Sequence, residues 1–255
     1  MNPNNYAKKE RFPMKHYTET FEYATFDKCG KTVPYRIHYP EHRDENGKCP
    51  AVLFLHGAGE RGTDNQLQLR IGLDVAMKDE DSPLHDALII APQVEMDEHQ
   101  QERWVYSDWG LGNFNMDELE ESVWVKSAVA ILKEKIEECN VDPERVYIMG
   151  ISMGGFGSWY IMSRYPELFA AGFPCCGAGD PTKAHILKNI PIFTFHGEVD
   201  DVVPVGGTRE MVAAIKAAGG DKIFYKEYPG VNHWSWDLAY GEKEIIKEMF
   251  TLRKS

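Results

Sequence analysis

The sequence predicts an α/β protein with a mostly parallel, doubly wound sheet that follows an opening antiparallel hairpin. Short apolar runs alternate with segments of helical spacing after residue 39, which is the pattern of strands joined by helical crossovers. The chain of 255 residues is 43% hydrophobic, enough to bury the core of one large domain. We expect that domain to span residues 16–255, with an extension over 1–15.

Each expected element has its own signal. Two β-rich runs, 18–26 and 32–39, flank the turn residues Cys29, Gly30 and Lys31 and predict the hairpin. Apolar runs predict further strands at 51–55, 87–91, 145–149, 170–174, 192–195 and 223–228. Helices are expected at 155–165, 207–218, 238–252 and, longest, 116–139. Asn115 and Glu118 have the spacing of a capping box at the start of that longest helix.

Composition excludes several classes of protein. A formal net charge of −12 disfavours nucleic acid or an anionic membrane as a partner, because phosphates would be repelled. There is no apolar run of about 18 residues to cross a membrane. The N-terminus has no apolar signal-peptide core, so a cytoplasmic location is expected, or a secreted one if a leader has been removed.

The five cysteines carry no metal or disulfide signature. They are odd in number and lack C-x-x-C spacing, which gives no zinc signature and no obvious disulfide framework. Cys175 and Cys176 follow the helix after the serine motif described next, and we expect them to be small buried residues.

The motif Gly150-Ile-Ser152-Met-Gly154 lies between the apolar run 145–149 and a helical segment. Because this G-x-S-x-G motif stands between a strand and a helix, it predicts a sharp turn that exposes a nucleophilic serine. Glycines two residues before and after the serine avoid collisions in such a turn. Ser152 would also stand at a helix N-terminus, which favours developing negative charge. We expect Ser152 to be the nucleophile.

A serine nucleophile needs a general base and a carboxylate that orients the base. Three histidines follow Ser152 in the chain. His185 has an ordinary helix or loop context, and His196 ends a strand. His233 lies in a turn-rich loop after the last strand, at the sheet edge expected for Ser152, and is the predicted base.

The predicted acid is Asp200. It stands in the sequence H-G-x-x-D after the strand 192–195 and is followed by two valines and a proline. Asp201 and Glu198 in the same loop are alternatives. The chain order would then be serine, acid, histidine.

The transition state also requires donors for its oxyanion. The Met153 N–H directly follows the nucleophile. The second donor is expected from the loop after the strand 51–55, with Ala58 favoured and Gly59 as the alternative. His56 in that loop is expected to shape it through hydrogen bonds.

Aromatic residues gather in a long segment without clear periodicity, 92–115. Trp104 and Trp109 either pin this segment to the body of the protein or line the substrate cleft. Trp234, next to His233, is a third expected substrate contact.

The loop 57–62 also matches the dinucleotide-binding pattern G-x-G-x-x-G. The context does not fit that function. The acidic residues about 20 positions later, Asp79 to Asp81, fall in a charged loop bounded by proline, and polar residues follow Gly62 where an apolar helix should begin.

Four motifs together resemble the α/β-hydrolase superfamily: 55–62, 150–155, His196-Gly-x-x-Asp200 and Tyr228-Pro-Gly-x-x-His233. More narrowly, the chain resembles the phospholipase/carboxylesterase group and carbohydrate esterase family 1, which includes feruloyl and acetylxylan esterases. The resemblance implies an α/β-hydrolase fold and a metal-free serine esterase, for which we expect no cofactor. Its substrates would be small-molecule or oligosaccharide esters, with acetyl or feruloyl groups on plant-derived sugars.

Three other functions stay open: a general short-chain carboxylesterase, a peptidase of the prolyl-oligopeptidase type, and a hydrolase fold that only binds. The peptidases usually carry a large gating domain, which a chain of 255 residues does not accommodate. A binding protein would be expected to lack a triad member, and none is missing.

Overall fold

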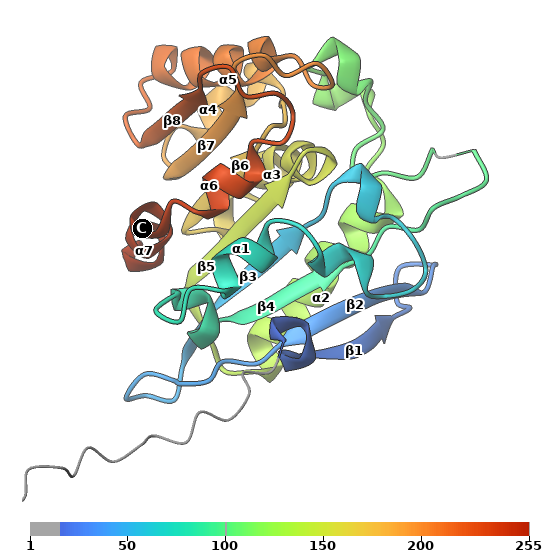
Figure 1. The fold of residues 1–255 in the computed structure, drawn as a ribbon, viewed down its shortest axis with the longest axis vertical. Coiled ribbons are helices and arrows are strands. Elements are labelled where there is room, and N and C mark those ends of the chain that lie inside the picture. Colours follow the sequence, from blue (N-terminus) through green and yellow to red (C-terminus); the bar gives the residue numbers. More distant parts are fainter. Residues whose placement is uncertain (1–15, 100, 255) are drawn as a thin grey trace, which may run out of the picture.

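The computed structural model describes residues 16–99 and 101–254, so the expected extension over 1–15 lies outside the described residues. The described chain forms one eight-stranded sheet in the order β1-β2-β4-β3-β5-β6-β7-β8 (Figure 1). The hairpin strands β1 (Phe21–Phe26) and β2 (Val33–His38) are antiparallel, as is the β2–β4 pair. All other neighbouring pairs are parallel. The predicted fold class is confirmed.

The remaining strands lie close to their predicted positions. They are β3 (Cys49–Leu55), β4 (Leu88–Pro92), β5 (Val141–Ile151), β6 (Ala171–Cys175), β7 (Ile192–Gly197) and β8 (Ile223–Tyr228). β3 is buried along its whole length. Such a run is expected for a parallel strand in the middle of a sheet that helices cover on both faces.

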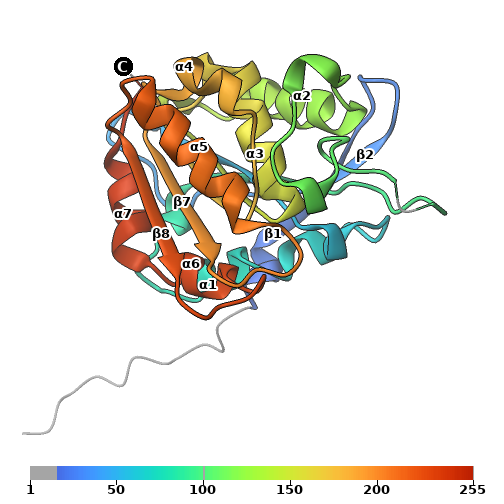
Figure 2. The same ribbon diagram turned by 90° about the horizontal axis from the view of Figure 1, so that it is seen from above.

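Alternate side chains of β3 enter two separate apolar clusters, one on each face of the sheet. One cluster packs against α2 (Val123–Glu138), α3 (Met153–Arg164), α4 (Ala184–Leu187) and α5 (Val205–Ala217). The other packs against α1 (Leu73–Met77), α6 (Trp236–Tyr240) and α7 (Lys243–Thr251). Figure 2 shows the two groups of helices on opposite sides of the sheet.

Short 3-10 turns complete the secondary structure. They lie at Tyr17–Thr20, Ala58–Glu60, Leu67–Leu69, Pro83–Asp86, Trp109–Leu111, Met116–Glu118, Pro166–Leu168 and Pro181–Lys183. None of the described helices is both long and apolar enough to span a membrane.

The prediction of one helix over 116–139 is wrong at its start. Asn115 and Glu118 do hydrogen bond to each other at 2.8 Å, but they cap only the 3-10 turn Met116–Glu118. α2 begins later, because Ser122 Oγ accepts the N–H of Val125 at 3.1 Å. The same hydroxyl donates to the carbonyl of Trp104 at 2.7 Å, which ties the helix start to the long loop.

The predicted final helix, 238–252, is two helices. α6 begins earlier, at Trp236, and the chain leaves helical geometry at Glu242, where ψ is 70°. The two helices bury different residues: Tyr240 of α6 packs edge-on against Phe54 and Phe173, whereas α7 buries Ile246, Met249 and Phe250. The break lets both helices face the sheet.

Candidate active site

Four loops meet at the carboxyl edge of the sheet, directly after β3, β5, β7 and β8. Parallel strands bring their carboxyl ends to the same edge, and open α/β sheets bind ligands there. The loop after β5 is the serine motif, the loop after β7 contains Asp200, and the loop after β8 contains His233.

The serine turn has the strained backbone that its motif predicts. Ser152 has φ of 52° and ψ of −118°, a conformation that a residue with a side chain rarely adopts. A Cβ at Gly150 would collide with the carbonyl oxygen of Gly154, and a Cβ at Gly154 would collide with that of Leu55. The Ser152 N–H donates to the carbonyl of Cys175 at 2.9 Å, which fixes the turn to the neighbouring strand.

The three predicted triad residues form one hydrogen-bonded chain. Ser152 Oγ lies 2.8 Å from His233 Nε2, and His233 Nδ1 lies 2.7 Å from Asp200 Oδ2. Asp200 Oδ1 accepts the backbone N–H groups of Val202 at 2.9 Å and Val203 at 2.8 Å. The carboxylate is thus held from both sides while the imidazole faces the serine.

Electrostatics favour an ionised acid. Burial acts to raise the pKa of Asp200, but hydrogen bonds from His196, His233 and the two backbone N–H groups outweigh it and hold the pKa well below its ordinary value. Burial acts to lower the pKa of His233, yet the hydrogen bond and charge of Asp200 raise it overall. An ionised Asp200 therefore keeps the proton on Nδ1 and leaves Nε2 free to accept the serine proton.

The two alternative acids do not reach His233 in this arrangement. Glu198 Oε2 accepts the N–H of Gly230 at 2.8 Å and so closes the turn before the histidine loop. Asp201 is exposed to solvent. Among the three carboxylates of this loop, Asp200 alone hydrogen bonds to His233 in the described chain.

The loop after β3 supplies free backbone donors beside the serine turn. Among the described residues, no hydrogen-bond acceptor faces the N–H of Ala58, Gly59 or Met153, so the choice between Ala58 and Gly59 stays open. His56 shapes this loop as predicted: Nε2 accepts the Val94 N–H at 3.0 Å, so Nδ1 donates to the Gly57 carbonyl at 2.6 Å. Burial lowers the pKa of His56 to about 4.

Arg61 connects this loop to the long loop. Its Nε donates to the Ala58 carbonyl at 2.9 Å, and its guanidinium also donates to the Glu102 carbonyl at 3.0 Å. The partner lies 41 residues away in the chain, so local sequence carries no signal for this contact.

The three tryptophans expected at the substrate have different positions. Trp104 is fully buried, and its Nε1 donates to the His56 carbonyl at 3.0 Å, so it pins the long loop to the body of the protein, whereas its contact with substrate stays a prediction. Trp109 is half-buried and packs 4.6 Å from the guanidinium of Arg103. Trp234 is 61% exposed and lies 4.8 Å from the ring of Trp236, whose other neighbour is His233 at 5.3 Å.

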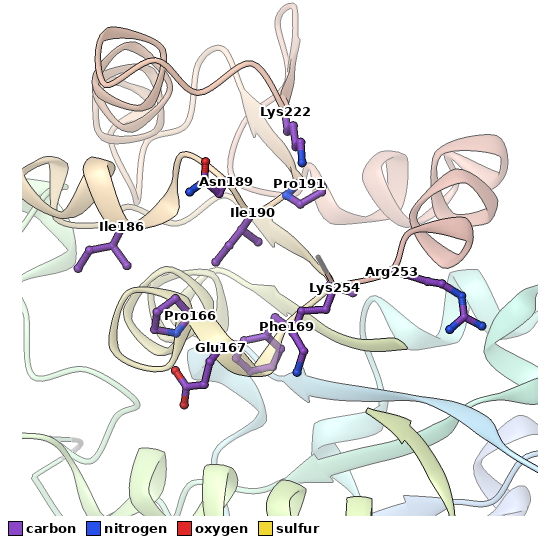
Figure 3. A pocket seen from close by; sticks show the side chains of 11 residues that line it. Pro166, Glu167, Phe169, Ile186, Asn189, Ile190, Pro191, Lys222, Arg253 and Lys254 are labelled. Atoms are coloured by element: carbon purple, nitrogen blue, oxygen red, sulfur yellow. The ribbon is translucent and has the colours of Figure 1, made fainter. Parts of the chain in front are cut away.

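Other features of the described chain lie apart from this site. Cys175 and Cys176 are buried, as expected. A hollow of about 620 Å³ is lined by Phe169, Ile190 and Lys222, among others, at the amino ends of the strands (Figure 3). That is the edge opposite Ser152. Within residues 16–99 and 101–254, no group of three His, Cys, Asp or Glu side chains is placed to hold a metal ion.

Residues 42–242 match the phospholipase/carboxylesterase family. The chain belongs to this family. A crystal structure of a thermostable esterase is 35% identical, with a TM-score of 0.82, and the alignment covers 93% of this chain and 64% of that one. The likeness covers most of this chain and agrees with the observed fold.

Two curated relatives are similar over shorter stretches. A bifunctional acetylxylan esterase/xylanase of Neocallimastix patriciarum is 32% identical over 94 residues, which are 37% of this chain and 14% of the relative. Feruloyl esterase B of Piromyces equi is 32% identical over 108 residues, 40% of this chain and 20% of the relative. The chain thus corresponds to a small part of each relative.

Proposed function

We propose that this protein hydrolyses carboxylic esters through an acyl-enzyme on Ser152. The single observation that carries the proposal is the hydrogen-bonded chain from Ser152 through His233 to Asp200, at an edge where the N–H groups of Ala58, Gly59 and Met153 have no acceptor among the described residues. Membership of the phospholipase/carboxylesterase family supports the same reaction class.

In the first step Ser152 Oγ forms a bond to the ester carbonyl carbon while His233 Nε2 takes the serine proton. The negative charge on the carbonyl oxygen is stabilised by the N–H of Met153 and that of Ala58 or Gly59. The alcohol leaves with the proton from His233. Water then attacks the acyl group with the same proton acceptor, and Ser152 is released with its proton.

We further propose that the ester carries an acetyl or aryl-acyl group, as on plant-derived sugars. Apolar side chains that solvent reaches flank the triad: Val199 and Val202 on the Asp200 loop are 53% and 50% exposed, and Trp234 is 61% exposed. A flat ring can stack on such a tryptophan with little loss of side-chain entropy. The names of the acetylxylan and feruloyl esterase relatives support this choice of substrate.

The first test compares wild type with Ser152→Ala on p-nitrophenyl acetate, butyrate and octanoate, methyl ferulate and acetylated xylo-oligosaccharide. We expect Ser152→Ala to lower kcat by about 10⁴-fold or more with unchanged folding. Ser163→Ala is the matched control, because the Ser163 hydroxyl donates to the Trp159 carbonyl within the same helix, at 2.9 Å. Near-normal turnover by folded Ser152→Ala would refute the assignment of the nucleophile.

The second test concerns the acyl group. Trp234→Ala should lower kcat/KM for methyl ferulate by about 2- to 10-fold relative to p-nitrophenyl acetate, since one aromatic pair contributes about 0.5–1.5 kcal/mol. Trp109→Ala tests the half-buried tryptophan in the same way. Equal losses on both esters would remove the aryl preference, and a wild-type preference for simple chains would indicate a general carboxylesterase.

A further inference from the structure

His196 is the next-to-last residue of β7, and its ring makes contacts that ester hydrolysis by the triad does not itself require. The side chain is fully buried. Its Nε2 lies 3.0 Å from the carbonyl oxygen of Val203 and 3.1 Å from Oδ2 of Asp200. Its Nδ1 lies 2.7 Å from Oγ1 of Thr208 in α5.

The partners decide where the ring protons sit. Neither oxygen that faces Nε2 carries a hydrogen, so Nε2 donates. Thr208 has one hydroxyl hydrogen, and its Oγ1 donates to the Gly177 carbonyl at 2.7 Å. Two oxygens this close need that hydrogen between them, so Oγ1 presents a lone pair to Nδ1. Both ring nitrogens of His196 thus face oxygens that can accept a hydrogen bond.

The carboxylate beside His196 Nε2 is the one that orients His233. Oδ2 of Asp200 receives an N–H from each imidazole, His233 at 2.7 Å and His196 at 3.1 Å, while Oδ1 is occupied by two backbone N–H groups. The side chain of Asp200 is fully buried. A buried carboxylate in this arrangement has its charge balanced before the reaction begins.

We propose that the His196 ring carries a proton on both nitrogens as a cation, and that it is a positioning residue that shares Asp200 with His233 and keeps His233 neutral in the resting protein. The proposal rests on the proposed role of His233 as general base. A positive charge on the far side of the carboxylate weakens the attraction that Asp200 exerts on a proton at His233. Since only a neutral His233 can accept the serine proton, His196 extends activity to lower pH.

Other charged or titratable groups also face the two rings. Glu227 of β8 stands opposite His196 in the strand register and is bound by the guanidinium of Arg209 from α5 at 2.6 Å. Asp201 acts on His233 from its own loop. Burial raises the pKa of the Cys176 thiol well above its ordinary value, so that group is neutral. The variants proposed next change none of these groups.

The decisive variant is His196→Gln, which can place an amide N–H where Nε2 lies but removes the charge. We expect the acidic limb of the kcat/KM profile for p-nitrophenyl acetate to move up by about one pH unit, the size expected when one nearby charge is lost. kcat on the plateau should change only a few-fold. If the acidic limb of His196→Gln lies at the same pH as that of the wild type, while plateau activity or stability falls, His196 has a structural role and the proposal is overturned.

Thr208 provides a matched pair that leaves both histidines in place. Thr208→Val removes the oxygen that accepts from Nδ1, so the ring can lose that proton, and the limb should move in the same direction as in His196→Gln. Thr208→Ser keeps the hydroxyl and should leave the limb unmoved. If the acidic limbs of Thr208→Val and Thr208→Ser lie at the same pH, the proposal is contradicted, even if His196→Gln does not fold.

A measurement on the resting protein separates this proposal from the proposed function. In ¹⁵N NMR spectra of histidine-labelled wild type at pH 8, both ring nitrogens of His196 should have protonated shifts, assigned by their loss in His196→Gln or by their change in Thr208→Val. One unprotonated nitrogen would overturn the proposal. If His196 is a cation but no ester is hydrolysed, the ion pair with Asp200 stands and the proposed function fails.

Discussion

The close approach of α3 to β3 can be tested by adding one methyl group at Gly154, the second residue of α3. A Cβ there would overlap the carbonyl oxygen of Leu55 and would lie 2.8 Å from the carbonyl oxygen of His56. Both obstacles are backbone atoms of a central strand and the loop that follows it. Neither can rotate away, so Gly154→Ala must push the helix off the sheet.

The magnitude follows from two opposing effects. Alanine is favoured over glycine in a helix by up to about 1 kcal/mol, whereas overpacking costs about 1–3 kcal/mol and occasionally more. Contact with fixed backbone places Gly154→Ala at the upper end of that cost, so we expect the free energy of unfolding to fall by about 2 kcal/mol. For a domain of this size, Tm would fall by about 4–8 °C.

Gly206 in α5 is the matched control, because an added Cβ there meets nothing within 4 Å. Gly206→Ala should raise the free energy of unfolding by about 0.5–1 kcal/mol. Urea and thermal unfolding of both variants measure the difference, and kcat/KM for p-nitrophenyl acetate should fall at least about 10-fold in Gly154→Ala alone. A Gly154→Ala protein as stable and active as Gly206→Ala would refute the reasoning.

Three further predictions concern the loop after β3. Burial holds the pKa of His56 at about 4 in the folded state, below about 6.5 in the unfolded chain. Between these two pH values the unfolded chain therefore binds more protons than the folded protein. Urea titrations should show the free energy of unfolding falling by about 3 kcal/mol from pH 7 to pH 4, and by less in His56→Asn. Arg61→Lys cannot keep both carbonyl contacts, to Ala58 and Glu102. It should lower kcat for p-nitrophenyl acetate while Tm stays close to that of the wild type, and an unchanged kcat would contradict this. Trp104→Phe loses the bond to the His56 carbonyl and some buried volume, and should lower the free energy of unfolding by about 1–3 kcal/mol with KM unchanged; a raised KM would instead indicate contact with substrate.

The sequence alone determined the fold class and the three residues of the candidate triad. Ser152, Asp200 and His233 each follow a recognisable strand, and parallel strands bring such positions to one edge of the sheet. The glycines that flank Ser152 are required by the turn itself, so local pattern was enough to find it.

Contacts between distant segments were decided only by the tertiary structure. Trp104 is buried because its indole reaches back to His56, 48 residues earlier, and no local pattern separates that role from a place in the cleft. α2 begins at Val123 and not at Met116 because the hydroxyl of its N-cap, Ser122, binds both the helix start and the long loop. The second imidazole on Asp200 depends on Thr208 from α5, which the chain brings beneath β7 only when the helix packs on the sheet. Short-range periodicity and chain order thus determine where side chains emerge, whereas packing determines which of them meet.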